Sequence, residues 1–271
     1  MSIVSPTTTT LKVTDYCNPN LCSAGRTHIA CGNSGDFSLS CPADRQLVNF
    51  TQNDIQVILN AHNTLRNKIA SGAQPGFNQA ARMATMVKLK EKIIISKIVK
   101  LCSQTWSSEL ASLAELNVKQ CEMKHDRCRS TADFRFAGQN LGMSGASNAF
   151  QPVQDVITNT VNDWYGEVSG ASQVDINTCC TAQSGQVIGH FTQVVTDRAI
   201  KVGCASSRFT IKGEGMSEGF RFTLFACNYA FTNLIGSKVY VSGNAASGCT
   251  SGVNPSYPAL CSVNENISAS V

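Results

Sequence analysis

Three histidines and one glutamate of this chain lie in short clusters of polar residues that could take part in chemistry. Imidazole and carboxylate groups are common general acids and bases, and imidazole is a common ligand of zinc and copper. Taken singly, each cluster also has a structural explanation. A histidine on the apolar face of a helix, such as His62, is more often a hydrogen-bonded core residue than a ligand. The clusters are His62-Asn63-x-x-Arg66, His125-Asp126-x-Cys128, Gly138-Gln139-Asn140, Glu167 after Trp164-Tyr165, and Gly189-His190-Phe191-Thr192-Gln193.

One of two common hydrolase patterns occurs in the sequence. Gly215-Met216-Ser217-Glu218-Gly219 matches the Gly-x-Ser-x-Gly pattern of a serine hydrolase. That pattern works only on a turn between a strand and a helix, whereas this stretch is predicted to join two strands, so we interpret it as a chance match. The zinc-protease pattern His-Glu-x-x-His is absent from the sequence.

Helical spacing of apolar residues predicts three helices before residue 170. The first begins at a cap on Thr51 or Asn53 and stops at Gly72, the second covers Ser107–Cys121, and the third covers Val153–Val168. Three later stretches, rich in β-branched and aromatic residues, are predicted as strands: Gly189–Val195, Lys201–Ser206 and Phe220–Tyr229. Helices first and strands later favour an α+β or layered domain.

The cysteines indicate an oxidising compartment. The chain has 13 of them and no Cys-x-x-Cys pair, which favours a disulfide framework over zinc ribbons or thioredoxin-like motifs. Sequons at Asn49 and Asn266 are candidate glycosylation sites and fit a secreted protein. Residues 1–15 carry neither the charged nor the apolar region of a signal peptide, so we expect that segment to be missing from the sequence.

Charge and hydropathy argue against nucleic-acid binding and against a transmembrane segment. The net charge is +4, and the segment 88–105 alone carries five lysines and one glutamate, so the rest of the chain is neutral. A neutral body with one short basic stretch is not typical of a nucleic-acid-binding protein. The longest apolar cluster, in residues 93–101, is interrupted by lysine and too short for a transmembrane segment.

Seven motifs, in order over roughly residues 50–235, resemble the CAP superfamily of cysteine-rich secretory, antigen 5 and pathogenesis-related 1 proteins. The segments 16–48 and 236–271, with four and two cysteines, look like those of the antigen 5-related (venom allergen 5-like) proteins of flies. The motifs are Ala61-His62-Asn63-x-x-Arg66, Trp106-x-x-Glu109-Leu110-Ala111, Cys121-x-x-x-His125-Asp126-x-Cys128-Arg129, Gly138-Gln139-Asn140, Trp164-Tyr165-x-Glu167, Gly189-His190-Phe191-Thr192-Gln193-Val194-Val195 and Ala226-Cys227-Asn228-Tyr229.

The resemblance implies an α+β fold, a three-layer α–β–α sandwich, over residues 49–235, with a disulfide-pinned N-terminal segment and a cysteine-stapled tail. It also implies a cavity tetrad of His125, Gln139, Glu167 and His190, in which Gln139 replaces a family carboxylate. Two neutral imidazoles suit zinc or copper, so His125 and His190 are the expected ligands of a weak, open zinc site. Two departures from the family pattern, Thr196 and Phe231-Thr232, fall at the edge of the fold.

The resemblance further implies a pairing of ten cysteines. The adjacent Cys179 and Cys180 have no family partner, so a bond between them and a bond from either to Cys102 both stay open. The implied pairs are Cys17–Cys31, Cys22–Cys128, Cys41–Cys121 and Cys204–Cys227, with Cys249 and Cys261 stapling the tail.

We therefore expect a non-catalytic extracellular module that binds a sterol, a fatty acid or a protein partner. The alternative is a metal- or His/Glu-dependent extracellular hydrolase, which is disfavoured because no nucleophile is evident and Gln139 is not an acid. An integrin-binding loop has no basis, because the sequence contains no Arg-Gly-Asp triplet.

The segment 88–105 interrupts the family pattern by 18 residues and contains Cys102. Without it the cysteine count is even, as a secreted framework requires, so we interpret it as a translated intron. A genuine insertion is the rival interpretation, either as a helix for a membrane surface or partner, or as a solvated excursion without function.

Overall fold

The computed structural model describes residues 13–86, 106–180, 185–213 and 219–270. The predicted insertion 88–105, Cys102 and most of the Gly215–Gly219 motif lie outside these residues. The helices are α1 (Gln52–Ala70), α2 (Ser108–Val118), α3 (Val153–Gly166), α4 (Gln173–Asn177) and α5 (Gly189–Val195), with the 3-10 helix η1 (Glu167–Gly170). The strands are β1 (Gln46–Leu47), β2 (Gly138–Ala146), β3 (Val202–Ile211), β4 (Phe220–Tyr229), β5 (Val253–Asn254) and β6 (Tyr257–Cys261).

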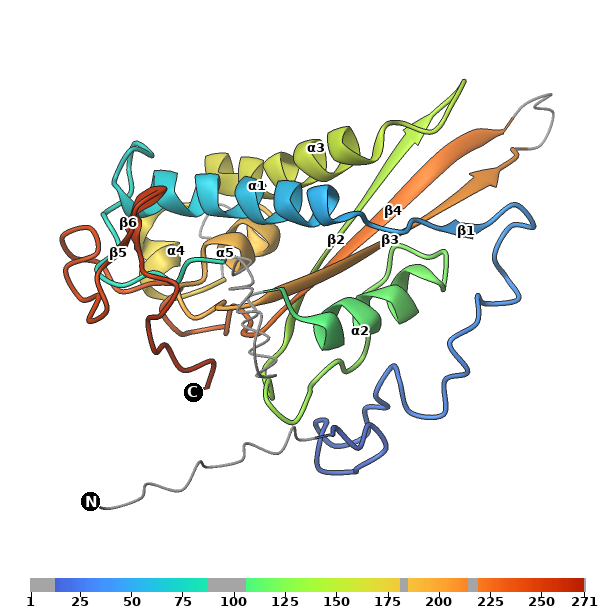
Figure 1. The fold of residues 1–271 in the computed structure, drawn as a ribbon, viewed down its shortest axis with the longest axis horizontal. Helices are drawn as coiled ribbons and strands as arrows, with labels where there is room; N and C mark the ends of the chain where they lie inside the picture. The colour runs from blue at the N-terminus through green and yellow to red at the C-terminus, as the bar shows by residue number, and fades with distance from the viewer. Residues whose placement is uncertain (1–12, 87–105, 181–184, 214–218, 271) are drawn as a thin grey trace, which may run out of the picture.

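An antiparallel sheet with strand order β1-β3-β4-β2 forms the middle layer. Helices α1 and α3 lie side by side over one face of it, and α2 covers the other (Figure 1). Each face has its own apolar core: Ile58 and Trp164 belong to the larger one, and Ala114 and Leu224 to the smaller one under α2. The predicted three-layer α–β–α sandwich is confirmed.

Helix α1 begins and ends where its sequence predicts. The Thr51 hydroxyl accepts the Asp54 N–H, and the Asp54 carboxylate accepts the Thr51 N–H, which satisfies two otherwise unpaired donors of the first turn. Beyond the last turn, Gly72 has a φ of +76°, a left-handed conformation that glycine adopts at low cost. Between these ends, Ile58 and Ile69 face the core and are fully buried.

The stretch 189–195 was predicted as a strand, and this prediction is wrong: it forms helix α5. Its β-branched and aromatic residues favour strands locally, but tertiary contacts override that preference. The Glu167 carboxylate accepts the backbone N–H groups of His190 and Phe191 at the first turn, and residues 191–195 are all buried rather than alternating. Strand β2 was missed because its sequence, with three glycines and one alanine among nine residues, carries little strand propensity.

Two glycines allow the layers to approach closely. A Cβ on Gly203 of β3 would lie 2.3 Å from the backbone nitrogen of Ala111, so α2 can pack directly on the strand only because that side chain is absent. A Cβ on Gly142 of β2 would lie 2.3 Å from a methyl carbon of Thr160 in α3. Both contacts set the distance between a helix and the sheet.

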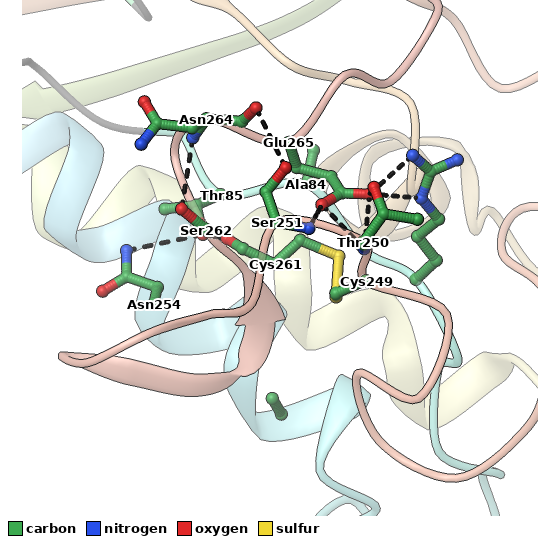
Figure 2. The surroundings of a disulfide bond; sticks show 12 residues. Ala84, Thr85, Cys249, Thr250, Ser251, Asn254, Cys261, Ser262, Asn264 and Glu265 are labelled. Atoms are coloured by element: carbon green, nitrogen blue, oxygen red, sulfur yellow. Dashed lines mark hydrogen bonds and ion pairs between the residues drawn. A yellow bond between two sulfur atoms is a disulfide. The ribbon is translucent and has the colours of Figure 1, made fainter.

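Disulfides hold the N-terminal segment and the tail against the sandwich. The structure contains the five pairs that the resemblance implies, and it also joins the neighbours Cys179 and Cys180. In the tail, the Cys249–Cys261 bond lies beside the Glu265 carboxylate, which accepts the N–H groups of Thr250 and Ser251 (Figure 2). Burial alone would raise the pKa of Glu265, but these hydrogen bonds and those from Arg82 and the Thr250 hydroxyl lower it to about 2.

Candidate functional site

His190 is held by the carboxylate of Glu167, at the junction of α3 and η1. Its Nδ1 lies 2.7 Å from Glu167 Oε1, and its backbone N–H donates to Glu167 Oε2 at 2.8 Å. An ionised carboxylate can only accept, so Nδ1 carries the ring proton. In the neutral ring the Nε2 lone pair of His190 is then left for another partner.

His125 is held in the same way by an amide. Its Nδ1 lies 2.9 Å from Gln139 Oε1 on β2, while Gln139 Nε2 donates to Asp126 Oδ2 at 2.7 Å and to Asn228 Oδ1 at 3.0 Å. These two acceptors fix the orientation of the amide, because only its nitrogen can donate to them. Gln139 Oε1 therefore accepts the Nδ1–H of His125, and Nε2 of the neutral His125 ring carries no proton.

The two histidines lie close enough for their charges to interact. Burial lowers the pKa of His125 from its ordinary value, and the charges of Arg129 and His190 lower it as well, while the hydrogen bond to Gln139 and the charge of Asp126 oppose this. His125 is therefore neutral at neutral pH, which is the state that binds a metal or accepts a hydrogen bond.

Strand β2 connects the surroundings of the two histidines. Asn140 Nδ2 donates to the His190 carbonyl oxygen at 3.1 Å, one residue after Gln139. Gly138 lies against Gln193 of α5, where a Cβ would be only 2.2 Å from Gln193 Oε1. The Gly138-Gln139-Asn140 motif therefore brings β2 against α5 and positions both histidines.

The structure adds Asp126, which sequence reasoning left out of the tetrad. Its side chain is only 1% exposed and is bound by Gln139, by Asn117 Nδ2 and by Arg129 Nε. A carboxylate is thus present behind Gln139, although position 139 itself is an amide. Its direct succession to His125 in the sequence was the signal that could have identified it.

His62 and Arg66 lie in the core, apart from the cavity. Both side chains are fully buried. His62 Nδ1 donates to the Ile58 carbonyl oxygen and Nε2 accepts the Tyr229 hydroxyl at 2.9 Å, and burial lowers the pKa of His62 to about 4. The Arg66 guanidinium donates to the carbonyl oxygens of Ala84, Val194 and Thr196, which gives it a structural role.

A pocket of about 460 Å³ lies beside His125. It is formed between the disulfide-pinned N-terminal segment and the chain that follows α2. Its lining is mainly polar or charged. The lining residues are Thr27, His28, Ile29, Cys31, Gly32, Asn33, Asn117, Gln120, Glu122, Lys124, His125, Asp126 and Arg127.

The donor set of the cavity fits at most a two-histidine metal site. Within the described residues, no three or more His, Cys, Asp or Glu side chains are arranged to hold a metal ion. Glu167 and Gln139 are occupied by Nδ1 of the histidines, which leaves only the two Nε2 atoms as candidate ligands. Such an arrangement orients the imidazoles and leaves most coordination positions open.

Three comparisons with known proteins agree with this architecture. The family described as "CAP: Cysteine-rich secretory protein family" matches residues 59–229. Venom allergen-1 of Aedes albopictus is 34% identical over 93% of this chain and 89% of its own length, and the antigen 5 like allergen Cul n 1 of Culicoides nubeculosus is 36% identical over 72% and 84%. The crystal structure of NaASP2 with Zn2+ superposes with a TM-score of 0.58 at 24% identity, covering 82% of this chain and all of the other.

Proposed function

The chain belongs to the cysteine-rich secretory protein (CAP) family, and on that premise we propose that it is a secreted antigen 5-like protein that binds a ligand without transforming it. The family description and the dipteran relatives support this assignment. Twelve cysteines paired within the described residues suit an oxidising, extracellular compartment. Asn49 and Asn266 are both exposed, as acceptors of glycans must be.

The hydrogen-bond partners of the cavity carry the proposal of binding without catalysis. Glu167 already accepts three N–H groups, and Gln139 uses both ends of its amide. Neither is free to take a proton from a substrate or water, so Nε2 of a histidine is the only group of the tetrad left for that role. Among the described residues, no Ser, Thr or Cys side chain is hydrogen-bonded to His125 or His190, as an activated nucleophile would be.

We propose that an apolar ligand, a sterol or a fatty acid, binds at the exposed ring of Phe136, close in sequence to Gln139. The apolar faces of α1 and α3 are used in the core, so they offer a ligand no free surface. Phe136, two residues before Gly138, is 40% exposed and packs against Phe231 with 6.2 Å between ring centroids. The Phe231 carbonyl oxygen accepts Gln193 Nε2 of α5, which ties this aromatic pair to the helix that carries His190.

A displacement screen with fluorescent sterols and fatty acids tests this ligand class. We expect saturable binding, with the ligand recovered unchanged, and weaker binding in Phe136→Ser. Leu39→Ser is a matched control, because Leu39 is 100% exposed and lies in the N-terminal segment. If no lipid displaces the fluorescent probes, the proposal of a lipid ligand is rejected and a protein partner is left as the ligand.

We further propose that His125 and His190 bind zinc weakly through their Nε2 atoms. A bound ion would supply a positive charge to attract an acidic group of a ligand. Zinc affinity should fall as the pH drops below about 6, because protonated imidazoles do not bind metals. Titration calorimetry at pH 7.4 checks this, and equal zinc uptake by the wild type and by His125→Ala/His190→Ala would reject the site.

A hydrolase remains the alternative function. It predicts cleavage of casein or of a peptide library that is lost in His190→Ala. Cleavage with that dependence would replace the binding proposal, whereas cleavage that persists in the variant would indicate a contaminating protease.

A further inference from the structure

The bond between Cys179 and Cys180 differs in kind from the other disulfides of the described chain. It joins neighbours just after α4, whereas the other five join residues 12 to 106 positions apart. In the chain-entropy model a disulfide stabilises the fold by restricting a loop of the unfolded chain. A bond between neighbours closes no such loop, so it adds no stabilisation of that kind.

The two cysteines differ in exposure. Cys179 is 1% exposed, and its backbone is paired on both sides, with its N–H donating to Ser237 O and its carbonyl oxygen accepting the Gly236 N–H, each at 2.7 Å. Cys180 is only partly buried, and its sulfur lies 3.6 Å from the Thr192 hydroxyl. Cys180 therefore offers more exposed surface than Cys179, and we infer that a thiol from solution attacks at Cys180.

The backbone at Cys180 favours opening of the bond. Its φ is +113°, in a region that residues with a side chain rarely adopt. Such a conformation persists only where the surroundings impose it. Here Cys179 is fixed by the 236–237 segment, and the disulfide ties Cys180 to it, so breaking the bond allows Cys180 to return to an ordinary conformation.

We propose that Cys179–Cys180 is a thiol-exchange site, at which a low-molecular-weight thiol of the glutathione type modifies Cys180. The thiolate attacks Cys180 Sγ, a new S–S bond forms, and the Cys179–Cys180 bond breaks with its electron pair leaving on Cys179, which takes up a proton. A second thiolate then attacks the sulfur of the bound thiol and releases Cys180. Two thiols are oxidised to one disulfide, and the protein pair gains two electrons and two protons.

The site is connected to the cavity through α5. Cys180 contacts Thr192, two residues after His190, and Asn233 Nδ2 donates both to the Thr192 hydroxyl and to the Gly189 carbonyl oxygen. An adduct on Cys180 would therefore crowd the first turn of α5. We expect the ring signals of His190 to shift on modification, and those of His125 to shift less.

The test is differential alkylation of the folded protein after exposure to reduced glutathione. Free thiols are trapped at intervals and each cysteine is read separately by peptide mass spectrometry, so Cys102 does not interfere. The matched reference is Cys249–Cys261, which also joins a partly exposed sulfur to a fully buried one, but across 12 residues and beside the Glu265 hydrogen bonds (Figure 2). We expect the glutathione adduct on Cys180 to form at least about tenfold faster than any opening of that reference bond.

Two single variants separate the sulfurs. In Cys179→Ser the remaining Cys180 thiol should form a mixed disulfide with oxidised glutathione, whereas in Cys180→Ser the buried Cys179 thiol should stay unmodified. The proposal is overturned by three results: equal reactivity in the two variants, opening of Cys249–Cys261 first, or a native bond from Cys179 or Cys180 to Cys102.

Discussion

Replacing Gln139 by glutamate restores a carboxylate to the cavity, and we predict that it destabilises the protein. Gln139 Nε2 now donates to Asp126 Oδ2 at 2.7 Å and to Asn228 Oδ1 at 3.0 Å. In Gln139→Glu both contacts become oxygen against oxygen. Asn228 cannot turn its amide to compensate without breaking the hydrogen bond from its Nδ2 to the Leu110 carbonyl oxygen.

The size and the pH dependence follow from these contacts. The hydrogen bond to Asn228 is lost at a cost of ~1 kcal/mol, and the contact with Asp126 is kept only where a proton lies between the two carboxyl groups. Asp126 is 1% exposed, and two buried carboxylates in contact do not both ionise, so the pair formed by the new carboxyl group and Asp126 retains a proton. Each unit by which the pKa of this pair is raised costs a further ~1.4 kcal/mol of stability. We expect a loss of ~3–5 kcal/mol at pH 7 on this basis. A carboxyl group whose pKa is raised in the folded state lowers stability fully above that folded pKa and not at all below its unfolded pKa. Between the two values the loss decreases as the pH falls, so the deficit should shrink towards pH 5.

Urea denaturation at pH 7 and at pH 5 measures this, with the variant compared with the wild type at each pH. Gln56→Glu is the control for adding one negative charge, because Gln56 is exposed on α1, and it should change stability by less than ~0.5 kcal/mol. A Gln139→Glu protein as stable as the wild type at pH 7, or one whose deficit grows towards pH 5, would refute the reasoning.

Three further changes test the fold around the site by denaturant unfolding. Gly138→Ala should lose ~1–3 kcal/mol because its Cβ would meet a side-chain oxygen of α5 at 2.2 Å, whereas Gly166→Ala, with no atom within 4 Å, should be neutral or slightly stabilising. Arg66→Met should lose at least ~3 kcal/mol, because three buried carbonyl groups lose their donors, and a smaller loss would show that they find others. Removing Cys22 and Cys128 together, which are 106 residues apart, should cost ~4–5 kcal/mol in the chain-entropy model, and an unchanged midpoint would contradict that model here.

The sequence correctly predicted those helices and strands whose local residue preferences agree with their tertiary contacts. The Thr51 cap and Gly72 stop define α1, and the apolar spacing of 153–168 predicts α3 apart from its last turn, which is η1. The strand predicted over 201–206 corresponds to the longer β3, which begins one residue later, at Val202, and continues to Ile211.

The features that were predicted wrongly or missed share a cause. Each of them depends on a contact with residues distant in the sequence. Helix α5 exists because Glu167, from the end of α3, accepts the first N–H groups of the helix. Strand β2 exists because its glycines fit under Thr160 and against Gln193. The motifs placed the tetrad residues in order, but the role of Asp126 behind Gln139 depends on a hydrogen bond that no spacing rule encodes.

The most direct test of the central claim is the protonation of the two cavity histidines in solution. The account requires that Glu167 and Gln139 hold the Nδ1 protons, so that the Nε2 atoms of His125 and His190 are free to bind a ligand. Long-range 1H–15N NMR of the imidazole rings at pH 7.4, assigned with His125→Ala and His190→Ala, reads this directly. We predict the neutral Nδ1–H tautomer for both rings, and a proton on Nε2 of either neutral ring would contradict the account.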